Sequence, residues 1–276
     1  MKPIALSGRL KAVSDMVTVG NRVCDVGCDH GFVPIYLIEQ GISPRVLAMD
    51  VRSGPLNAAK EHVAEHGLRS VIETRLSDGL HNYNIDEADT LICAGMGGRL
   101  MMRILSDDRR KTESFRELIL QPQSEIEQFR GWLRRQGYCI TDENMIEEDG
   151  KFYPMMRVVI NAERQDARAC GYEEICKELG HRQSLGVTGK MPTLDNTCDL
   201  MDGEKLCKLI DRYGPYLLLY KSNTLKTYLE REERIYGEIA DNLQMMGLSD
   251  EKRKNRYAEV MKLMGECRMA LKIVTS

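Results

Sequence analysis

The chain has 276 residues, of which 42% are hydrophobic, enough for one large domain or two smaller ones with proper cores. A formal net charge of −3 argues against a generally basic, nucleic-acid-binding surface, although not against a local basic patch. No stretch approaches the ~20 apolar residues of a membrane span, and the N-terminus lacks a signal peptide's apolar block. The nine cysteines form no Cys-x-x-Cys pair and no zinc-ligand spacing, so we expect a cytoplasmic protein with reduced thiols and no metal.

The first part of the chain alternates short apolar runs with helical patterns. The spacing predicts helices over residues 4–19, 32–40, 55–66, 99–106 and 124–136. The apolar runs predict strands over residues 22–26, 45–50, 71–76, 89–94 and 117–121. Strands separated by helices pair in parallel through right-handed crossovers. We therefore expect an α/β fold with a doubly wound sheet.

Two β-prone runs follow, over residues 138–146 and 152–160, and the Asp149-Gly150 pair between them is a hairpin signal. An antiparallel hairpin that closes a parallel sheet is typical of Rossmann-like methyltransferases rather than of dehydrogenases. The strand pattern then stops, which predicts a domain boundary after residue 162.

Residues 163–276 are predicted to form a second, helical domain. It starts with short helices around a loop at 186–200 and ends with two long helical patterns. Their apolar stripes are Leu225, Leu229, Tyr236, Ile239, Leu243 and Met246 in the first, and Tyr257, Val260, Met264, Cys267, Leu271 and Val274 in the second. Gly247 separates them, and Ser249 or Asp250 could cap the second. Such narrow stripes favour an antiparallel coiled-coil hairpin.

The strongest functional signal lies between Arg22 and Pro34, where a short buried strand leads into a glycine loop and a helix. Gly27 and Gly31 let the backbone turn tightly and approach a ligand closely. A dinucleotide site would want glycine where this chain has Asp29, because the loop receives a pyrophosphate. Asp25 and Asp29 would repel that group, but they suit an ammonium and ribose hydroxyls, as carried by S-adenosylmethionine.

The next three strands also end in chemically informative residues. Asp50 ends the second strand and could accept both ribose hydroxyls of an adenosine. Asp78, beside Gly79, could either meet the adenine amino group or make a turn. The fourth strand ends in glycines, and Gln121 lies at the end of the fifth. Since all these strand ends meet at one edge of a parallel sheet, they predict one shared site.

Five motifs together resemble a bacterial family of tRNA (adenine(22)-N1)-methyltransferases. They are Leu6-Ser-Gly-Arg-Leu10, Asp25-Val-Gly-Cys-Asp-His30 with Pro34, Ala94-Gly-Met-Gly-Gly98, Leu118-Ile-Leu-Gln-Pro122 and Tyr213-Gly-Pro-Tyr-Leu217. The resemblance implies a Rossmann-like class I catalytic domain over residues 1–162, a helical coiled-coil domain over 163–276, S-adenosyl-L-methionine as cofactor and tRNA as substrate. We also expect a monomer. The chain departs from the family in its 186–200 loop, which is longer than is typical.

The resemblance assigns cofactor or active-site roles to Arg9, Asp25, Gly27, Asp29, His30, Asp50, Asp78, Gly95 and Met96. The neighbouring motif residues Gly31, Gly79 and Ala94 complete the predicted cofactor site. Adenine N1 carries a lone pair, so its methylation needs positioning and charge stabilisation rather than a base. Asp29 is the predicted catalytic carboxylate, accepting from N6, and His30 is the alternative proton handler.

N1 lies on the Watson–Crick edge, so a paired adenine must first be unpaired or flipped. The predicted phosphate contacts are Arg99, Arg103, Arg109, Arg110, Lys252, Arg253 and Lys254; a solvated helix face is the alternative reading. Two other functions stay open at this point. One is a methyltransferase for a small molecule or a protein, and the other is a non-catalytic RNA-binding protein on a Rossmann scaffold. A nicotinamide oxidoreductase fits least well.

Overall fold

A computed structural model describes residues 4–160, 175, 178 and 203–276. The chain divides into two compact units, Met1–Gly171 and Tyr172–Ser276. The predicted domain boundary after residue 162 and the predicted loop at 186–200 both lie outside the described residues.

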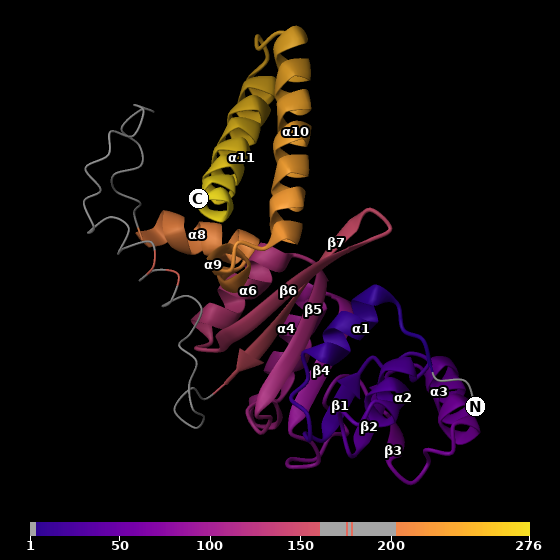
Figure 1. The fold of residues 1–276 in the computed structure, drawn as a ribbon. Helices are drawn as coiled ribbons and strands as arrows, with labels where there is room; N and C mark the ends of the chain where they lie inside the picture. Colours follow the sequence, from indigo (N-terminus) through magenta and orange to yellow (C-terminus); the bar gives the residue numbers. More distant parts are fainter. Residues whose placement is uncertain (1–3, 161–174, 176–177, 179–202) are drawn as a thin grey trace. The chain divides into compact units, whose positions relative to one another are not determined.

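The first unit is built on a seven-stranded sheet with the strand order β3-β2-β1-β4-β5-β7-β6 (Figure 1). Five strands pair in parallel: β1 (Val23–Val26), β2 (Val46–Asp50), β3 (Ile72–Leu76), β4 (Thr90–Gly97) and β5 (Glu117–Ser124). The antiparallel hairpin of β6 (Cys139–Glu148) and β7 (Lys151–Val159) closes the sheet beside β5. Both predictions, the parallel sheet and the closing hairpin, are confirmed. Strand order reverses at β1, which is where open α/β sheets bind ligands.

Helices cover both faces of this sheet. On one face lie α1 (Gly8–Asp15), α2 (Phe32–Glu39) and α3 (Ser53–Glu65). On the other face α4 (Gly98–Asp107), α5 (Arg109–Thr112) and α6 (Ile126–Arg135) pack together. The predicted helix over 4–19 is too long, because the Ser7 hydroxyl caps the helix by accepting the Leu10 amide. Helix α5 was not predicted, since four residues are too few to show a helical period.

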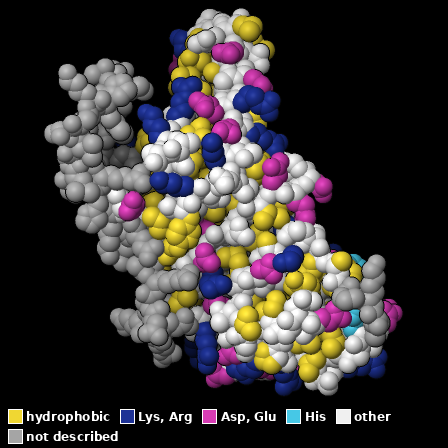
Figure 2. All heavy atoms as spheres, viewed as in Figure 1, with side chains coloured by type: hydrophobic (Ala, Val, Ile, Leu, Met, Phe, Trp, Pro, Cys, Tyr) yellow, Lys and Arg dark blue, Asp and Glu magenta, His cyan; other side chains and the backbone are white. Residues whose placement is uncertain are grey.

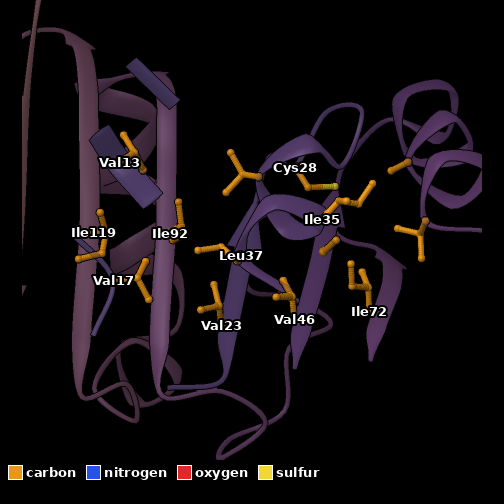
Figure 3. Close-up of a cluster of buried hydrophobic side chains, with 14 of the residues drawn as sticks. Val13, Val17, Val23, Cys28, Ile35, Leu37, Val46, Ile72, Ile92 and Ile119 are labelled. Carbon is orange, nitrogen blue, oxygen red and sulfur yellow. The ribbon is translucent and has the colours of Figure 1, made fainter. Parts of the chain in front are cut away.

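The core beneath α1, α2 and α3 fixes where the strands end. Val23, Val46, Ile72, Ile92 and Ile119 point from five neighbouring strands toward the helices (Figure 3). Val13, Ile35 and Leu37 meet them from the helices, and all of these side chains are buried. Burying each such side chain is worth about 1.5–3 kcal/mol. The core therefore holds the carboxyl ends of β1, β2 and β4 in a fixed relation.

The second unit is helical, with α8 (Gly203–Tyr213), α9 (Pro215–Leu219), α10 (Asn223–Met245) and α11 (Glu251–Thr275). Helices α10 and α11 form an antiparallel hairpin (Figure 1). Ser222 and Asp250 cap them, as predicted for Asp250. The predicted stripes are confirmed at their buried members Leu225, Leu229, Val260, Met264, Cys267 and Val274. Met246 is 68% exposed, so its place in the stripe is wrong: α10 ends just before it, at the turn.

Glu232 interrupts the apolar stripe of α10 for a reason visible in the structure. Its carboxylate accepts hydrogen bonds from the hydroxyls of Tyr228 and Tyr236, at 2.8 and 2.9 Å, and from Tyr213 at 3.1 Å. A half-buried carboxylate is tolerated where several donors satisfy it. Whether the hairpin is a true coiled coil stays a prediction. Across the described residues, no helix combines the length and apolar character needed to cross a bilayer.

Gly31 offers a test of how α2 is joined to the sheet. Its φ is 75°, and a Cβ added there would lie 3.0 Å from the Cβ of Ala59 in α3. We expect Gly31→Ala to lower the free energy of unfolding by about 2–4 kcal/mol, from left-handed strain and overpacking. Gly54→Ala is the matched control, because a Cβ there meets nothing within 4 Å. Urea unfolding measures both; equal stability of the two variants would contradict this reading.

Candidate cofactor and active site

A cavity of about 460 Å³ lies at the carboxyl ends of β1, β2, β3 and β4. Its size falls in the range of small-molecule sites. The structure brings nearly all predicted cofactor residues to its walls: Arg9, Asp25, Gly27, Asp29, Asp50, Asp78, Gly79, Ala94, Gly95 and Met96, together with His30. Gly31 does not line the cavity, and its prediction as a ligand contact finds no support in this placement. A glycine is needed at position 31 for a different reason: this N-cap residue of α2 has a left-handed φ and packs closely against Ala59.

Asp25, at the end of β1, is a buried carboxyl group facing this cavity. Its side chain is 4% exposed, and no described residue donates a hydrogen bond to its carboxylate. Burial, and then the nearby charge of Asp50, raise the pKa of Asp25 to about 7. Such a group is poised to take up either a proton or a cationic ligand.

Asp50 ends β2 and is fixed in place by backbone donors. Its Oδ2 accepts the Asp29 amide at 3.2 Å, and its Oδ1 accepts the Arg52 amide at 2.8 Å. An ionised carboxylate has about four acceptor positions, so these two bonds leave capacity for further donors. A vicinal diol could use both remaining positions.

Asp29 stands at the exposed side of the cavity in an unusual backbone conformation. Its φ is 48°, a left-handed value that aspartate tolerates better than most residues. Its Oδ1 lies 3.7 Å from Arg52 Nη2 and 3.8 Å from His30 Nε2. Arg52 was not among the predicted site residues. The available signal was its position, two residues after the strand-end acid.

The end of β4 forms the opposite wall. The strand was predicted to stop at residue 94, but pairing with β5 continues to Gly97 through register shifts around Met96. Such irregularities re-aim backbone and side chains beside sites. The buried Gln121 side chain organises this wall, since its Oε1 accepts Arg9 Nη1 at 2.9 Å and the Gly95 amide at 3.1 Å. Met96 lies over Gly27, where any added Cβ would overlap its terminal methyl group.

Asp78 and Arg103 form an ion pair on the remaining wall. Arg103 Nη2 and Nη1 donate to the two Asp78 oxygens at 2.9 and 3.2 Å, and this pairing lowers the pKa of Asp78. Both residues line the cavity. Arg103 was predicted to contact RNA phosphate, yet the structure places its guanidinium at the cavity and pairs it with a carboxylate.

The other predicted phosphate contacts differ in how free they are. Arg99 is 83% exposed and lies 3.6 Å from Glu125, whereas Arg109 is paired with Glu113 and Arg110 is exposed. In the second unit, Lys252 and Lys254 are exposed. Arg253 Nη1 donates to the Met246 and Gly247 carbonyls at 2.7 and 3.2 Å, so it also braces the hairpin turn. Within the described part of the chain, no group of three or more His, Cys, Asp or Glu is placed to hold a metal ion.

The raised pKa of Asp25 gives a stability prediction. The folded state holds this proton more tightly than the unfolded chain, whose ordinary value is 3.8, so stability falls as pH rises from about 4 to about 7. Asp25→Asn removes the penalty. Its melting temperature should match wild type near pH 4 and exceed it at pH 8, by roughly 2–4 °C per kcal/mol of stabilisation. Calorimetric melting across pH checks this, and a difference that does not change with pH would refute the assignment.

Comparison with known proteins agrees with this geometry. The methyltransferase domain family matches residues 6–156. The tRNA (adenine(22)-N(1))-methyltransferase of Bacillus subtilis (strain 168) is 36% identical over 180 residues, which cover 65% of this chain and 74% of that protein.

Solved structures of similar proteins match almost the whole chain. The crystal structure of the B. subtilis M1A22 tRNA methyltransferase TrmK has a TM-score of 0.73 at 26% identity, covering 97% of this chain and 99% of that one. Streptococcus pneumoniae Sp1610, solved in complex with S-adenosyl-L-methionine, has a TM-score of 0.69 at 26% identity, covering 97% and 100%. The chain belongs to the tRNA (adenine(22)-N(1))-methyltransferase family.

Proposed function

We propose that this protein transfers a methyl group from S-adenosyl-L-methionine to N1 of adenine 22 in tRNA. The observation that carries the proposal is the cavity at the switch point of the sheet, lined by Asp25, Asp29 and Asp50, in a chain of this family. Three carboxylates would repel the pyrophosphate of a dinucleotide. They favour a ligand that brings positive charge and hydroxyl donors.

The residues present fit S-adenosylmethionine. Asp25, buried and without a hydrogen-bond donor among the described residues, would take the ammonium group. Asp50 would accept the ribose hydroxyls with the positions its backbone bonds leave free. Asp78 and Gly79 would border the adenine. When bound, the cofactor supplies an electrophilic methyl group on a sulfonium.

The protein's own part in the reaction is to position adenine and to stabilise charge. The N1 lone pair needs no base, so the site must align the base and exclude water. Apolar side chains of Val33, Ile92, Leu100 and Ile104 line the cavity beside the carboxylates. Asp29 would accept from N6 and balance the positive charge that develops on the ring. A nitrogen of Arg52 and one of His30 each lie within 4 Å of its carboxylate. His30 is the alternative group for handling a proton.

Docking of tRNA requires contacts to phosphates outside the acidic cavity. We assign these to Arg99 and Arg110 of the first unit and to Lys252 and Lys254 of the second, all exposed. On the face seen in Figure 2, Lys and Arg side chains are interspersed with acidic ones along the α10–α11 hairpin. Binding through such contacts weakens steeply with added salt. We infer that the protein acts in the cytoplasm, where tRNA is its substrate, and that it acts as a monomer.

The proposed reaction is tested by nucleoside mass spectrometry. Unmodified tRNA transcripts with adenine at position 22 are incubated with the protein and S-adenosylmethionine. We expect one N1-methyladenosine per transcript, and none in a matched transcript with guanine at that position. Tight binding of S-adenosylmethionine without methylation of any tRNA would instead point to a small-molecule or protein substrate.

The role of Asp29 is tested by Asp29→Asn, which keeps the size and one acceptor oxygen but removes the charge. We expect turnover to fall on the order of 100-fold, as for a lost preorganised electrostatic contact. Affinities for cofactor and tRNA should change far less, because the interaction strengthens only in the transition state. The matched control is Asp86→Asn, an exposed aspartate with a similar left-handed φ of 70° that does not line the cavity.

Single-turnover methylation at saturating cofactor separates the two possible roles of Asp29. Intact single-turnover methylation together with weakened cofactor binding would make Asp29 a cofactor ligand only. His30, or positioning by the backbone at Gly95 and Met96, would then account better for the rate.

A further inference from the structure

Three aromatic rings meet at the outer side of the cavity. His30 belongs to the glycine loop, Phe32 is the first residue of α2, and His62 lies in α3. The Phe32 ring is stacked on both histidines, with centroids 5.7 Å from His30 and 5.1 Å from His62 and interplanar angles of 24° and 20°. The two histidine rings are 6.1 Å apart. These spacings are those of favourable aromatic pairs.

A hydrogen bond from His62 to the backbone of His30 fixes the position of this aromatic cluster. His62 Nδ1 lies 2.9 Å from the His30 carbonyl oxygen, which can only accept, so Nδ1–H donates there and orients the ring against Phe32. His62 itself does not line the cavity, whereas His30 and Phe32 do. The cluster therefore consists of one supporting residue and two residues that line the cavity.

Phe32 is not needed for the core of α2. The residues that anchor the helix are Val33, Ile35 and Leu37, which are buried, while Phe32 is 40% exposed. The His30 side chain beside it is 48% exposed. A large apolar ring left in water at the rim of a cavity is a surface that a ligand could cover.

Resting on the proposed function, we propose that Phe32, supported by His30 and His62, is the wall on which the extruded target adenine stacks. Stacking holds a purine by its face and leaves its Watson–Crick edge free, which methylation at N1 requires. Asp29 lies three residues before Phe32, at the loop that leads into α2, so the edge and face contacts come from one short segment.

Charge explains why a base, rather than the RNA backbone, enters here. Asp25, Asp29 and Asp50 repel phosphates, but an aromatic face accepts an uncharged base. As N1 gains the methyl group, the purine becomes cationic, and the face of Phe32 attracts a cation. Phe32 would thus stabilise the methylated, cationic adenine at its face, while Asp29 stabilises it at its edge.

The test uses the full-length protein with Phe32→Leu, which keeps an apolar side chain but removes the ring. We expect kcat/KM for tRNA to fall about 5- to 150-fold, the loss of one base–aromatic stack. Phe32→Tyr should retain activity, and calorimetric affinity for S-adenosylmethionine should be unchanged in both. The control is Ile85→Ala, an apolar residue that is 49% exposed, against 40% for Phe32, and does not line the cavity.

A second measurement reports stacking directly. In tRNA with 2-aminopurine at position 22, stacking on a ring quenches the fluorescence, so the complex with Phe32→Leu should be brighter than the wild-type complex. His62→Ala should shift the signal in the same direction, and His62→Phe, which keeps the supporting ring, should restore much of it. This rescue would not follow if His62 only stabilised the fold.

Wild-type kinetics and wild-type fluorescence in Phe32→Leu would overturn the proposal. A loss of cofactor affinity equal to the loss of kcat/KM would also overturn it, because the ring would then belong to the cofactor site. Both results concern the variant and are compatible with methylation of tRNA by the wild-type protein. Failure of the wild-type protein to methylate tRNA would instead refute the proposed function itself.

Discussion

The mutual repulsion of Asp25, Asp29 and Asp50 within one cavity is the constraint around which the first unit is arranged. Each carboxylate is accommodated differently. Asp50 is held by two backbone amides, Asp29 faces solvent beside Arg52, and Asp25 has a pKa raised to about 7. The cavity thus carries negative charge that a cationic ligand would balance. A sulfonium cofactor with an ammonium group would be such a ligand.

The fold maintains this arrangement because strand ends cannot move independently. The core between the sheet and α1–α3 fixes the carboxyl ends of β1 and β2, where Asp25 and Asp50 lie. On the other wall, the buried Gln121 side chain ties Arg9 to the irregular end of β4 at Gly95. Hydrophobic burial thereby supplies the stability that holds like charges close together.

The sheet and its closing hairpin could be predicted from hydrophobic periodicity and turn residues, because both depend on local sequence patterns. The convergence of Asp25, Asp50 and Asp78 on one edge followed from the parallel topology. Side-chain partners could not be predicted in this way. The pairing of Arg103 with Asp78, the bracing role of Arg253 and the contact of the Tyr213 hydroxyl with Glu232 all join residues distant in sequence or across a turn. Roles of the predicted site residues in catalysis stay predictions.

We expect the carboxylate-lined switch point to select a cationic methyl donor over a dinucleotide. Isothermal titration of the purified protein with S-adenosylmethionine and, separately, with NAD⁺ tests it most directly. We predict saturable binding of S-adenosylmethionine and no measurable binding of NAD⁺, because Asp25 and Asp29 oppose a pyrophosphate. Binding of NAD⁺ as tight as that of S-adenosylmethionine, or no binding of S-adenosylmethionine to the folded protein, would contradict the account.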